Sequence, residues 1–208
     1  MMRLLAFSDL HCDRTAAAHL ADLAREVDVV VGAGDFAIQH RGLDDTIRAL
    51  ASITVPAVLV PGNGEYTEAL EGACRAHWPS ATVLHGTGTS VGGHSFFGLG
   101  GGVPITPFGD WSFDLSEDQA RVLLEDCPDH AGLVTHSPPR DACDLDAGGT
   151  PLGSLAIREA VVRRKPRLVI CGHVHASWTR RARIGDSMVV NAGPQGVLLT
   201  VSPDGEVG

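Results

Sequence analysis

The sequence predicts an α/β fold in which short buried strands alternate with helices. Its strand candidates are apolar runs that stop abruptly at small or polar residues, and its helix candidates place apolar residues on one side. The apolar runs are rich in Val and Leu and do not alternate with polar residues, so we expect strands buried on both faces. Helices between the strands indicate crossover connections, which make several of the strands parallel.

The elements follow one another along the chain without an internal repeat or a linker. We expect strands at residues 3–8, 28–32, 57–60, 132–135, 167–170 and 188–190, with further candidates at 83–84, 95–97 and 197–199. Helical patterns cover residues 15–27, 43–53, 67–76, 116–124 and 152–162, and Ser116 with acidic residues after it is typical of a helix start. Residues 85–114 are rich in glycine and read as a hairpin followed by a long functional loop.

Composition restricts the class of protein. The 208 residues suit one domain spanning 1–208 with no room for a separate cap domain. A net charge of −9 argues against binding a nucleic-acid duplex, which needs a basic stripe. Five scattered cysteines form neither a disulfide framework nor a CxxC site. With no signal peptide and no membrane-length apolar stretch, the expected location is the cytoplasm.

Polar side chains with metal-binding chemistry follow five of the predicted strands. In open α/β sheets, ligands bind beyond the carboxyl ends of strands, so we expect these side chains at one edge of one sheet. Any one of them alone reads as an ordinary strand-end residue, but no packing rule places all of them there. Four imidazoles and two carboxylates suit borderline divalent transition metals, and the set exceeds the needs of one ion. The residues are Asp9, His11, Asp35, Asn63, His136, His173 and His175.

These residues lie in motifs that resemble those of a known family. The blocks 8–11 (Ser-Asp-Leu-His), 34–35 (Gly-Asp), 62–65 (Gly-Asn-Gly-Glu), 135–139 (Thr-His-Ser-Pro-Pro) and 172–175 (Gly-His-Val-His) resemble, in order, those of the calcineurin-like metallophosphoesterases. The resemblance covers nearly the whole chain and implies a four-layer α/β/β/α sandwich with two mixed sheets and a dinuclear metal centre at the carboxyl edge of the strands.

The same resemblance implies a role for each predicted ligand. Asp9, His11 and His175 are expected to hold one metal ion, and Asp35 to bridge it to a second. The second ion is expected to be held by the residues Asn63, His136 and His173. The catalytic roles are expected to fall on Asp35, Asn63 and His136. Mn²⁺ is the preferred ion, with Fe, Co, Ni or Zn as alternatives.

One departure from the family pattern bears on catalysis. The family reads Gly-Asn-His-Asp/Glu, whereas this chain has Gly64 after Asn63. The absent histidine is the residue usually held near the leaving-group oxygen, so its loss impairs general-acid catalysis but not metal binding. Glu65 is interpreted as a support behind the ligands or as a charge at a helix N-terminus.

A narrower resemblance points to the brain-type subfamily of metallophosphoesterase-domain proteins. Members of that subfamily can carry a non-histidine residue in the Asn block, and residues 102–113 look like their loop. Phe108 and Trp111 in this loop can stack on a nucleobase or anchor the loop. Arg14 can contact a substrate phosphate or lie on the surface, and His40 borders the site or is a solvated loop residue.

We therefore expect a phosphoesterase that hydrolyses small phosphodiesters or nucleotides with two divalent ions, which can generate hydroxide and clamp the phosphate oxygens. Substrate contacts are assigned to Asn63, Gly64, Arg14, Phe108 and Trp111. The alternative is a nucleotide-binding protein with a low-activity, vestigial dinuclear site. A non-enzymatic scaffold is a weaker rival, because a scaffold has no use for a bridging carboxylate. No membrane partner is expected, and a dimer is the expected oligomer.

Overall fold

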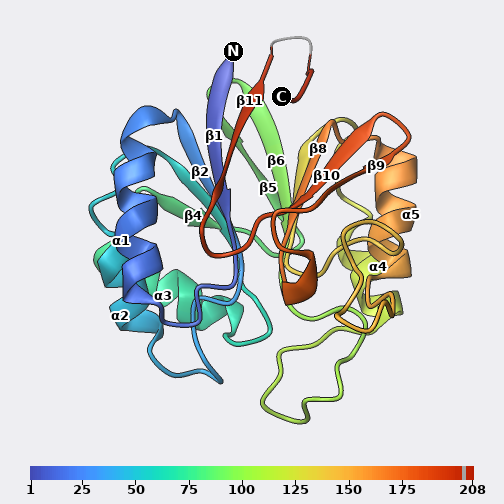
Figure 1. Cartoon of the computed structure of the whole chain (residues 1–208), viewed down its shortest axis with the longest axis horizontal. Helices are drawn as coiled ribbons and strands as arrows, with labels where there is room; N and C mark the ends of the chain where they lie inside the picture. The colour runs from blue at the N-terminus through green and yellow to red at the C-terminus, as the bar shows by residue number, and fades with distance from the viewer. Residues whose placement is uncertain (203–204) are drawn as a thin grey trace.

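In the computed structural model, which describes residues 1–202 and 205–208, two mixed β-sheets face each other between two layers of helices (Figure 1). The first sheet has the strand order β11-β1-β2-β3-β4, and all its strands are parallel except β11, which is antiparallel to β1. Its strands are β1 (Met2–Phe7), β2 (Val29–Ala33), β3 (Ala57–Val60), β4 (Ala81–Val83) and β11 (Val197–Val201).

The second sheet has the order β5-β6-β7-β8-β10-β9, with a parallel centre from β6 to β10 and an antiparallel strand at each edge. Its strands are β5 (Thr87–Val91), β6 (His94–Leu99), β7 (Gly132–Thr135), β8 (Leu168–Cys171), β9 (Arg181–Ile184) and β10 (Ser187–Asn191). The predicted α/β class and the four-layer sandwich are confirmed by this arrangement.

Helices cover the outer face of each sheet. The first sheet is covered by α1 (Arg14–Leu23), α2 (Leu43–Leu50) and α3 (Thr67–His77), and the second by α4 (Glu117–Leu123) and α5 (Leu155–Arg164) (Figure 1). Ser116 caps α4 as the sequence predicted, because its hydroxyl accepts from the Gln119 N–H while the Gln119 side chain returns to the Ser116 N–H.

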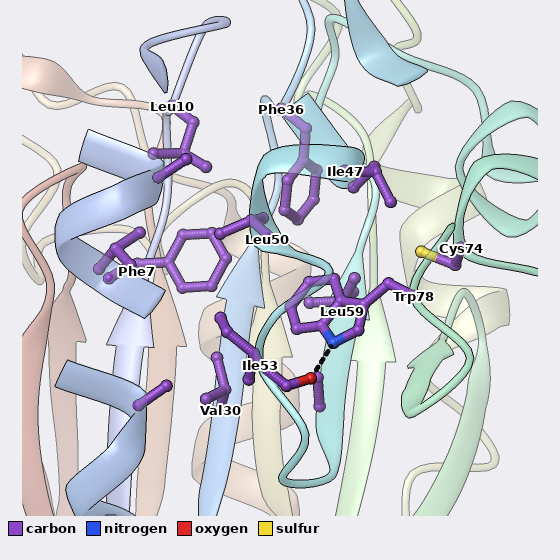
Figure 2. Close-up of a cluster of buried hydrophobic side chains, with 14 of the residues drawn as sticks. Phe7, Leu10, Val30, Phe36, Ile47, Leu50, Ile53, Leu59, Cys74 and Trp78 are labelled. Carbon is purple, nitrogen blue, oxygen red and sulfur yellow. Dashed lines mark hydrogen bonds between the residues drawn. The ribbon is translucent and has the colours of Figure 1, made fainter. Parts of the chain in front are cut away.

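Buried apolar side chains fill all three spaces between the layers. Beneath α1–α3, Phe7 and Phe36 pack edge to face, and the indole of Trp78 donates a 2.9 Å hydrogen bond to the Ile53 carbonyl (Figure 2). Between the sheets, strand residues such as Val31, Val134 and Val190 are fully buried. The central strands are therefore covered on both faces, which explains their non-alternating apolar sequences.

The structure differs from the sequence prediction mainly at element ends. The helix expected at 15–27 ends at Leu23 and continues as a 3₁₀ turn, Ala24–Glu26, and the helix expected at 152–162 begins only at Leu155. That start is delayed because the Ser154 hydroxyl caps the helix by accepting from the Ile157 N–H. Strand β9 was missed because its sequence, Arg-Ala-Arg-Ile, is that of a charged edge strand rather than an apolar run.

The expectation of one sheet edge is wrong. Asp9, Asp35 and Asn63 follow β1, β2 and β3 of the first sheet, whereas His136 and His173 follow β7 and β8 of the second. The site is therefore shared between the carboxyl ends of strands in two facing sheets. Among the described residues, the helices are all too short or too polar to span a bilayer.

Candidate metal centre

The two sheets bring all seven predicted ligands together at one end of the sandwich. Two groups of donors each fit a single ion, since the ligand atoms of each group lie within 4.8 Å of one another. We call Asp9, His11 and His175 the outer cluster, and Asp9, Asp35 and His136 the inner cluster. Asp9 belongs to both clusters, so a carboxylate other than Asp35 also lies between the two positions.

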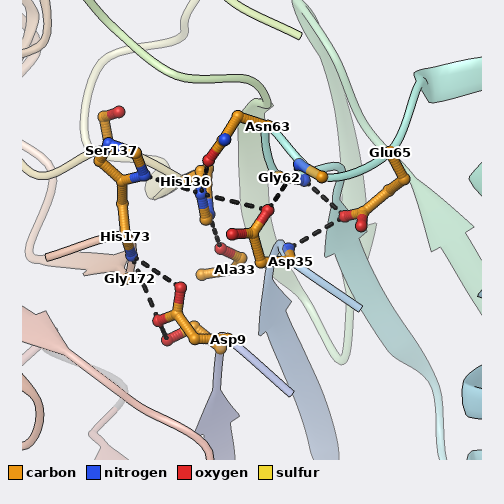
Figure 3. Close-up of polar contacts among 12 residues, drawn as sticks. Asp9, Ala33, Asp35, Gly62, Asn63, Glu65, His136, Ser137, Gly172 and His173 are labelled. Atoms are coloured by element: carbon orange, nitrogen blue, oxygen red, sulfur yellow. Dashed lines mark hydrogen bonds and ion pairs between the residues drawn. The ribbon is translucent and has the colours of Figure 1, made fainter. Parts of the chain in front are cut away.

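The inner cluster is buried. The side chain of His136 is fully enclosed, and its Nε2 lies 3.5 Å from Asp35 Oδ1 and 3.0 Å from Asn63 Oδ1 (Figure 3). His173 lies in neither three-residue cluster, but its Nδ1 is 3.2 Å from the same His136 nitrogen. Asn63 and His173 thus border the inner cluster.

The outer cluster is open to solvent. The side chains of His11 and His175 are 32% and 52% exposed, and their Nε2 atoms lie 3.2 Å apart. His11 Nε2 is 3.5 Å from Asp35 Oδ2, and His175 Nε2 is 3.8 Å from Asp9 Oδ1. Asp35 therefore presents one oxygen to each side, which is the geometry expected of its bridging role.

Backbone carbonyls orient two of the imidazoles. His136 Nδ1 lies 2.8 Å from the Ala33 carbonyl, and His11 Nδ1 lies 3.3 Å from the Ala37 carbonyl. A carbonyl can only accept, so each Nδ1 carries the hydrogen, and each Nε2 is left to face the cluster. An outer hydrogen bond of this kind fixes the tautomer and the ring orientation of histidine ligands.

The ligands occupy unusual backbone conformations. Asp9, His11, Asp35 and His173 all have positive φ, between 43° and 65°. Each such non-glycine residue costs on the order of 1–3 kcal/mol, and this cost is tolerated where the surrounding structure holds the conformation. Bonds between neighbouring loops supply that hold, for example from the Asp9 N–H to the Gly34 carbonyl and from the His11 N–H to the Asp35 carbonyl, both 2.9 Å.

Glu65 supports the inner cluster from behind. Its carboxylate is completely buried and accepts hydrogen bonds from the backbone N–H groups of Asp35 and Gly62 (Figure 3). It also accepts one from the backbone N–H of Ala37. The first of the two sequence interpretations therefore applies: Glu65 holds the loops that carry Asp35 and Asn63. Burial, followed by the negative charge of Asp35, raises the pKa of Glu65 to about 7, while the N–H bonds favour its charged form.

Electrostatics distinguish the histidines. Burial opposes the charged form of His136, but the carboxylates of Asp35 and Asp9 and the Ala33 carbonyl outweigh it and raise its pKa. Burial lowers the pKa of His173 to about 3, helped by the neighbouring His136, and burial also lowers the pKa of His175. A cation is therefore favoured between the buried carboxylates. His173 and His175 are neutral near it, so their ring nitrogens can act as metal donors.

This donor set fits divalent metal ions. Asp9 and Asp35 are 2% and 4% exposed, and two carboxylates buried this close to each other need a positive partner. The imidazole nitrogens turned toward them supply the remaining donors that Mn, Fe, Co, Ni or Zn prefer.

The predicted substrate residues occupy different places. Gly64 lies against the inner cluster, because its N–H donates to Asp35 Oδ1 at 2.8 Å. Arg14 is exposed at the first position of α1. Phe108 and Trp111 stack on each other with ring centroids 5.7 Å apart, and the Trp111 carbonyl is hydrogen-bonded to the His40 ring. His40 is thus tied to the loop across the site rather than being only a solvated residue.

The loop that carries Trp111 also holds a predicted ligand. Ser112 Oγ accepts from the Asn63 side-chain amide at 3.0 Å, and the Phe113 N–H donates to the Asn63 carbonyl at 3.0 Å. The Asp114 carboxylate accepts from the Ser112 hydroxyl in turn, at 2.8 Å. With its amide nitrogen engaged in this way, Asn63 turns Oδ1 toward His136.

A family model matches nearly the whole sequence. The calcineurin-like phosphoesterase superfamily domain matches residues 2–204. The chain belongs to this superfamily. Comparison with curated proteins gave no match.

Solved structures share the fold of this calcineurin-like phosphoesterase domain at low sequence identity. The protein TT1561 of Thermus thermophilus is 20% identical, with a TM-score of 0.73 over 93% of this chain and 90% of that chain. An archaeal phosphodiesterase is 14% identical, with a TM-score of 0.61 over 100% and 98%. A dimetal phosphatase from Danio rerio is 14% identical, with a TM-score of 0.60 over 97% and 93%.

Several supporting residues of the site were missed from the sequence. Ser8 Oγ lies 2.5 Å from Asp9 Oδ2, and the Trp178 indole N–H donates to the same oxygen at 3.0 Å. The amide nitrogen of Asn191 donates to the Gly172 and Val174 carbonyls and so holds the turn between the two last histidines. Ser8 directly follows β1 and Asn191 is the last residue of β10, so their place at strand ends is a usable signal, but nothing local marks Trp178.

Proposed function

We propose that this protein is a metal-dependent hydrolase of small phosphodiesters or nucleotides, acting at a dinuclear site with impaired proton donation to the leaving group. The observation that carries the proposal is the pair of donor clusters joined by Asp9 and by the two oxygens of Asp35. Two bound divalent ions supply positive charge for the phosphate oxygens and lower the pKa of water. Membership of the superfamily and the fold shared with a phosphodiesterase and a dimetal phosphatase are consistent with this chemistry.

The chain's own residues define the remaining steps. Asp35 and Asn63 would each contribute an oxygen donor to the ions, and Gly64 leaves the space beside these residues without a side chain. When the leaving group of a diester has a low pKa, it departs as an anion without a proton. Hydrolysis of such a diester therefore needs no general acid at position 64. We therefore expect diesters to be cleaved better than alkyl monoesters. Stacking on Phe108 or Trp111 gives a nucleotide substrate a surface for its base.

The test combines metal analysis with a substrate panel. Wild-type protein is loaded with Mn²⁺, its metal content is measured, and hydrolysis of bis-(p-nitrophenyl) phosphate is compared with that of alkyl phosphomonoesters. Asp35→Asn should abolish hydrolysis, whereas Asp28→Asn, which changes an exposed carboxylate just before β2, should not. Preference for alkyl monoesters, or activity that survives Asp35→Asn, would contradict the proposal.

The second candidate is a nucleotide-binding protein with a vestigial site. It is favoured by Gly64, because the missing imidazole is the group expected to protonate poor leaving groups. This reading expects AMP or GMP to bind tightly to the metal-loaded protein while diester turnover stays negligible. Calorimetry with the monophosphates, run beside the hydrolysis panel, separates the two candidates.

The finer assignments are part of the same proposal. Mn²⁺ as the native ion, the brain-type subfamily, a cytoplasmic location and a dimeric state are predictions from the sequence. The subfamily assignment rests on the sequence of residues 102–113 and on Gly64 in the Asn block. Mn²⁺ is checked by metal analysis of protein purified without added metal, and the dimer by light scattering.

A further inference from the structure

Asp9 uses its two oxygens differently. Oδ2 lies 2.5 Å from the Ser8 hydroxyl and 3.0 Å from the Trp178 indole nitrogen, both of which donate to it. The His173 N–H is shared between the two oxygens, at 3.0 Å from Oδ1 and 3.2 Å from Oδ2. Oδ1 is the oxygen nearest His175 Nε2, at 3.8 Å. Oδ2 therefore accepts two side-chain hydrogen bonds besides its share of the His173 N–H, whereas Oδ1 accepts only that shared N–H and keeps a lone pair for an ion.

Trp178 touches a second member of the outer cluster. Its ring packs against the His175 imidazole, with centroids 4.4 Å apart and an angle of 32° between the planes. His175 lies in a 3₁₀ turn, His175–Ser177, and its side chain is half exposed. The indole therefore packs against an imidazole whose side chain is otherwise half exposed to solvent.

The indole is itself held in place. A Cβ built on Gly193, whose φ is +69°, would lie 2.8 Å from Trp178 Cγ, so the backbone of Gly193 packs directly on the ring. The Gly193 N–H donates to Ser8 Oγ at 2.9 Å, and the Ser8 N–H donates to the Gly193 carbonyl at 3.0 Å. Gly193, Ser8 and Trp178 therefore form one rigid unit around Asp9 Oδ2.

We propose that Trp178 is a positioning residue that sets the metal affinity of the outer cluster without being a ligand. Its N–H fixes which oxygen of Asp9 faces the ion, and its ring limits the swing of His175. The proposal deepens the function proposed above, since it rests on an ion binding at the outer cluster. Hydrogen-bonding partners behind metal ligands typically change metal affinity about 10–100-fold when they are removed.

Two substitutions separate the two contacts. Trp178→Phe keeps an aromatic ring against His175 but removes the N–H, whereas Trp178→Leu removes both. We expect Trp178→Phe to weaken Mn²⁺ binding at the outer cluster about tenfold, and Trp178→Leu to weaken it by about 100-fold. At the inner cluster, which shares only Asp9 with this support, we expect a change of about threefold or less. Trp78→Phe is the matched control, because that indole donates to the Ile53 carbonyl beneath α1–α3, and its loss should leave both affinities unchanged.

Calorimetric titration of metal-free protein with Mn²⁺ gives the two affinities, and a second mutation assigns them. In a His11→Ala background the outer ion is already lost, so adding Trp178→Phe should change the remaining affinity little. In a His136→Ala background the same change should still weaken the outer ion. Urea unfolding of the metal-free variants shows whether the effect is merely structural.

Three results overturn the proposal: wild-type affinity at both clusters in Trp178→Leu, equal weakening of both clusters, or weakening that accompanies an equal loss of stability in the metal-free protein. Wild-type protein that binds no ion at the outer cluster overturns it as well. Two bound ions without phosphoester turnover refute the proposed function alone, because the role of Trp178 is measured by metal binding.

Discussion

The inner and outer clusters share Asp9 and lie within one site, yet they are built in opposite ways. The inner cluster has a fully enclosed His136 and is braced by a buried Glu65, whereas the outer cluster has a half-exposed His175 in a short 3₁₀ turn. Burial removes water that competes for the ion and prevents side-chain movement. We infer that the inner position binds its ion more tightly, and that the outer position exchanges its ion more readily.

The largest expected effect removes the charge of Asp35, a carboxylate that faces both positions. Asp35→Asn takes away the negative charge that faces His11 through one oxygen and His136 through the other. We expect both ions to be lost, with the affinity for each reduced by more than about 100-fold. That value is the upper end of the loss seen when a hydrogen-bonding partner behind a metal ligand is removed. Elemental analysis of Mn²⁺-saturated protein measures the result.

His11→Ala is the matched variant for that experiment, because it should lose mainly the outer ion. Loss of both ions from His11→Ala, or one ion retained at full affinity in Asp35→Asn, would show that the two positions are not divided as described. At most one ion in saturated wild type would remove the basis for the comparison.

The second effect tests the support behind the inner cluster. Glu65→Gln replaces one carboxylate oxygen by an NH₂ group. Because both oxygens of Glu65 accept hydrogen bonds from backbone N–H groups, the new NH₂ group must face a backbone N–H. We expect the free energy of unfolding of the metal-free protein to fall by about 1.5–3 kcal/mol, the range for hydrogen bonds to charged groups. Urea denaturation measures it, with Glu68→Gln in the exposed first turn of α3 as control. Equal stability of both variants would mean that Glu65 does not brace the inner cluster.

The two clusters also show which features of the site could be predicted from the sequence. Each ligand follows an apolar strand, so strand ends alone located all seven, including Asp9 and His136 from different sheets. Strand ends did not predict that the strands divide into two facing sheets, because the sequence of a strand does not indicate to which sheet it belongs. The two sheets were predicted only by the family resemblance. The contact between Trp178 and Asp9 was out of reach, since it joins residues 169 positions apart through a single indole N–H.

The loop from Gly102 to Asp114 shows the same limit. Its glycines and prolines predicted a functional loop, and its place beside the site agrees with that prediction. Its bond to Asn63 depends on the side-chain network of Thr106, Ser112 and Asp114, whose spacing has no secondary-structure period. Networks of this kind follow from the folded loop and not from a local pattern.

The third effect concerns the gap beside the inner cluster. A positioned general acid contributes about 10²–10⁴-fold. Gly64 lies outside the left-handed region, but a Cβ there would come within 3.0 Å of the Ala37 carbonyl oxygen and 3.1 Å of Asp35 Oδ1. We expect Gly64→His to recover only part of the factor, about tenfold in kcat, and only for esters with poor leaving groups.

Gly64→Ala is the control for that variant, since it adds the same Cβ without an imidazole. A rate gain that grows with the pKa of the leaving group supports a lost acid. A fall in kcat for an alkyl phosphoester in both variants, with metal content intact, would show instead that position 64 must stay empty for the substrate.

The smallest effect is a pH dependence of stability that should come from His136 of the inner cluster and from Glu65 behind it. The pKa of Glu65 is raised from 4.5 to about 7, and that of His136 is raised above 6.5. A group with a raised pKa stabilises the fold below its unfolded pKa, and this contribution is lost as the pH rises through its folded pKa. The lowered pKa values of His173 and His175 act in the opposite direction, mainly below pH 6.5 and only weakly above it. Between pH 6.5 and 8, the metal-free protein should therefore lose stability, by on the order of 1 kcal/mol.

Metal should reverse this trend, because an ion at the inner cluster displaces the proton from His136 and is bound more tightly as the pH rises. Urea midpoints measured with a chelator should thus fall from pH 6.5 to 8, and midpoints measured with Mn²⁺ should rise relative to them. His136→Ala should reduce both trends, whereas His11→Ala should leave the metal-free trend in place. A metal-free protein that becomes more stable over this interval would place the titrating groups outside the inner cluster, and the contrast in burial would then not control the electrostatics of the site.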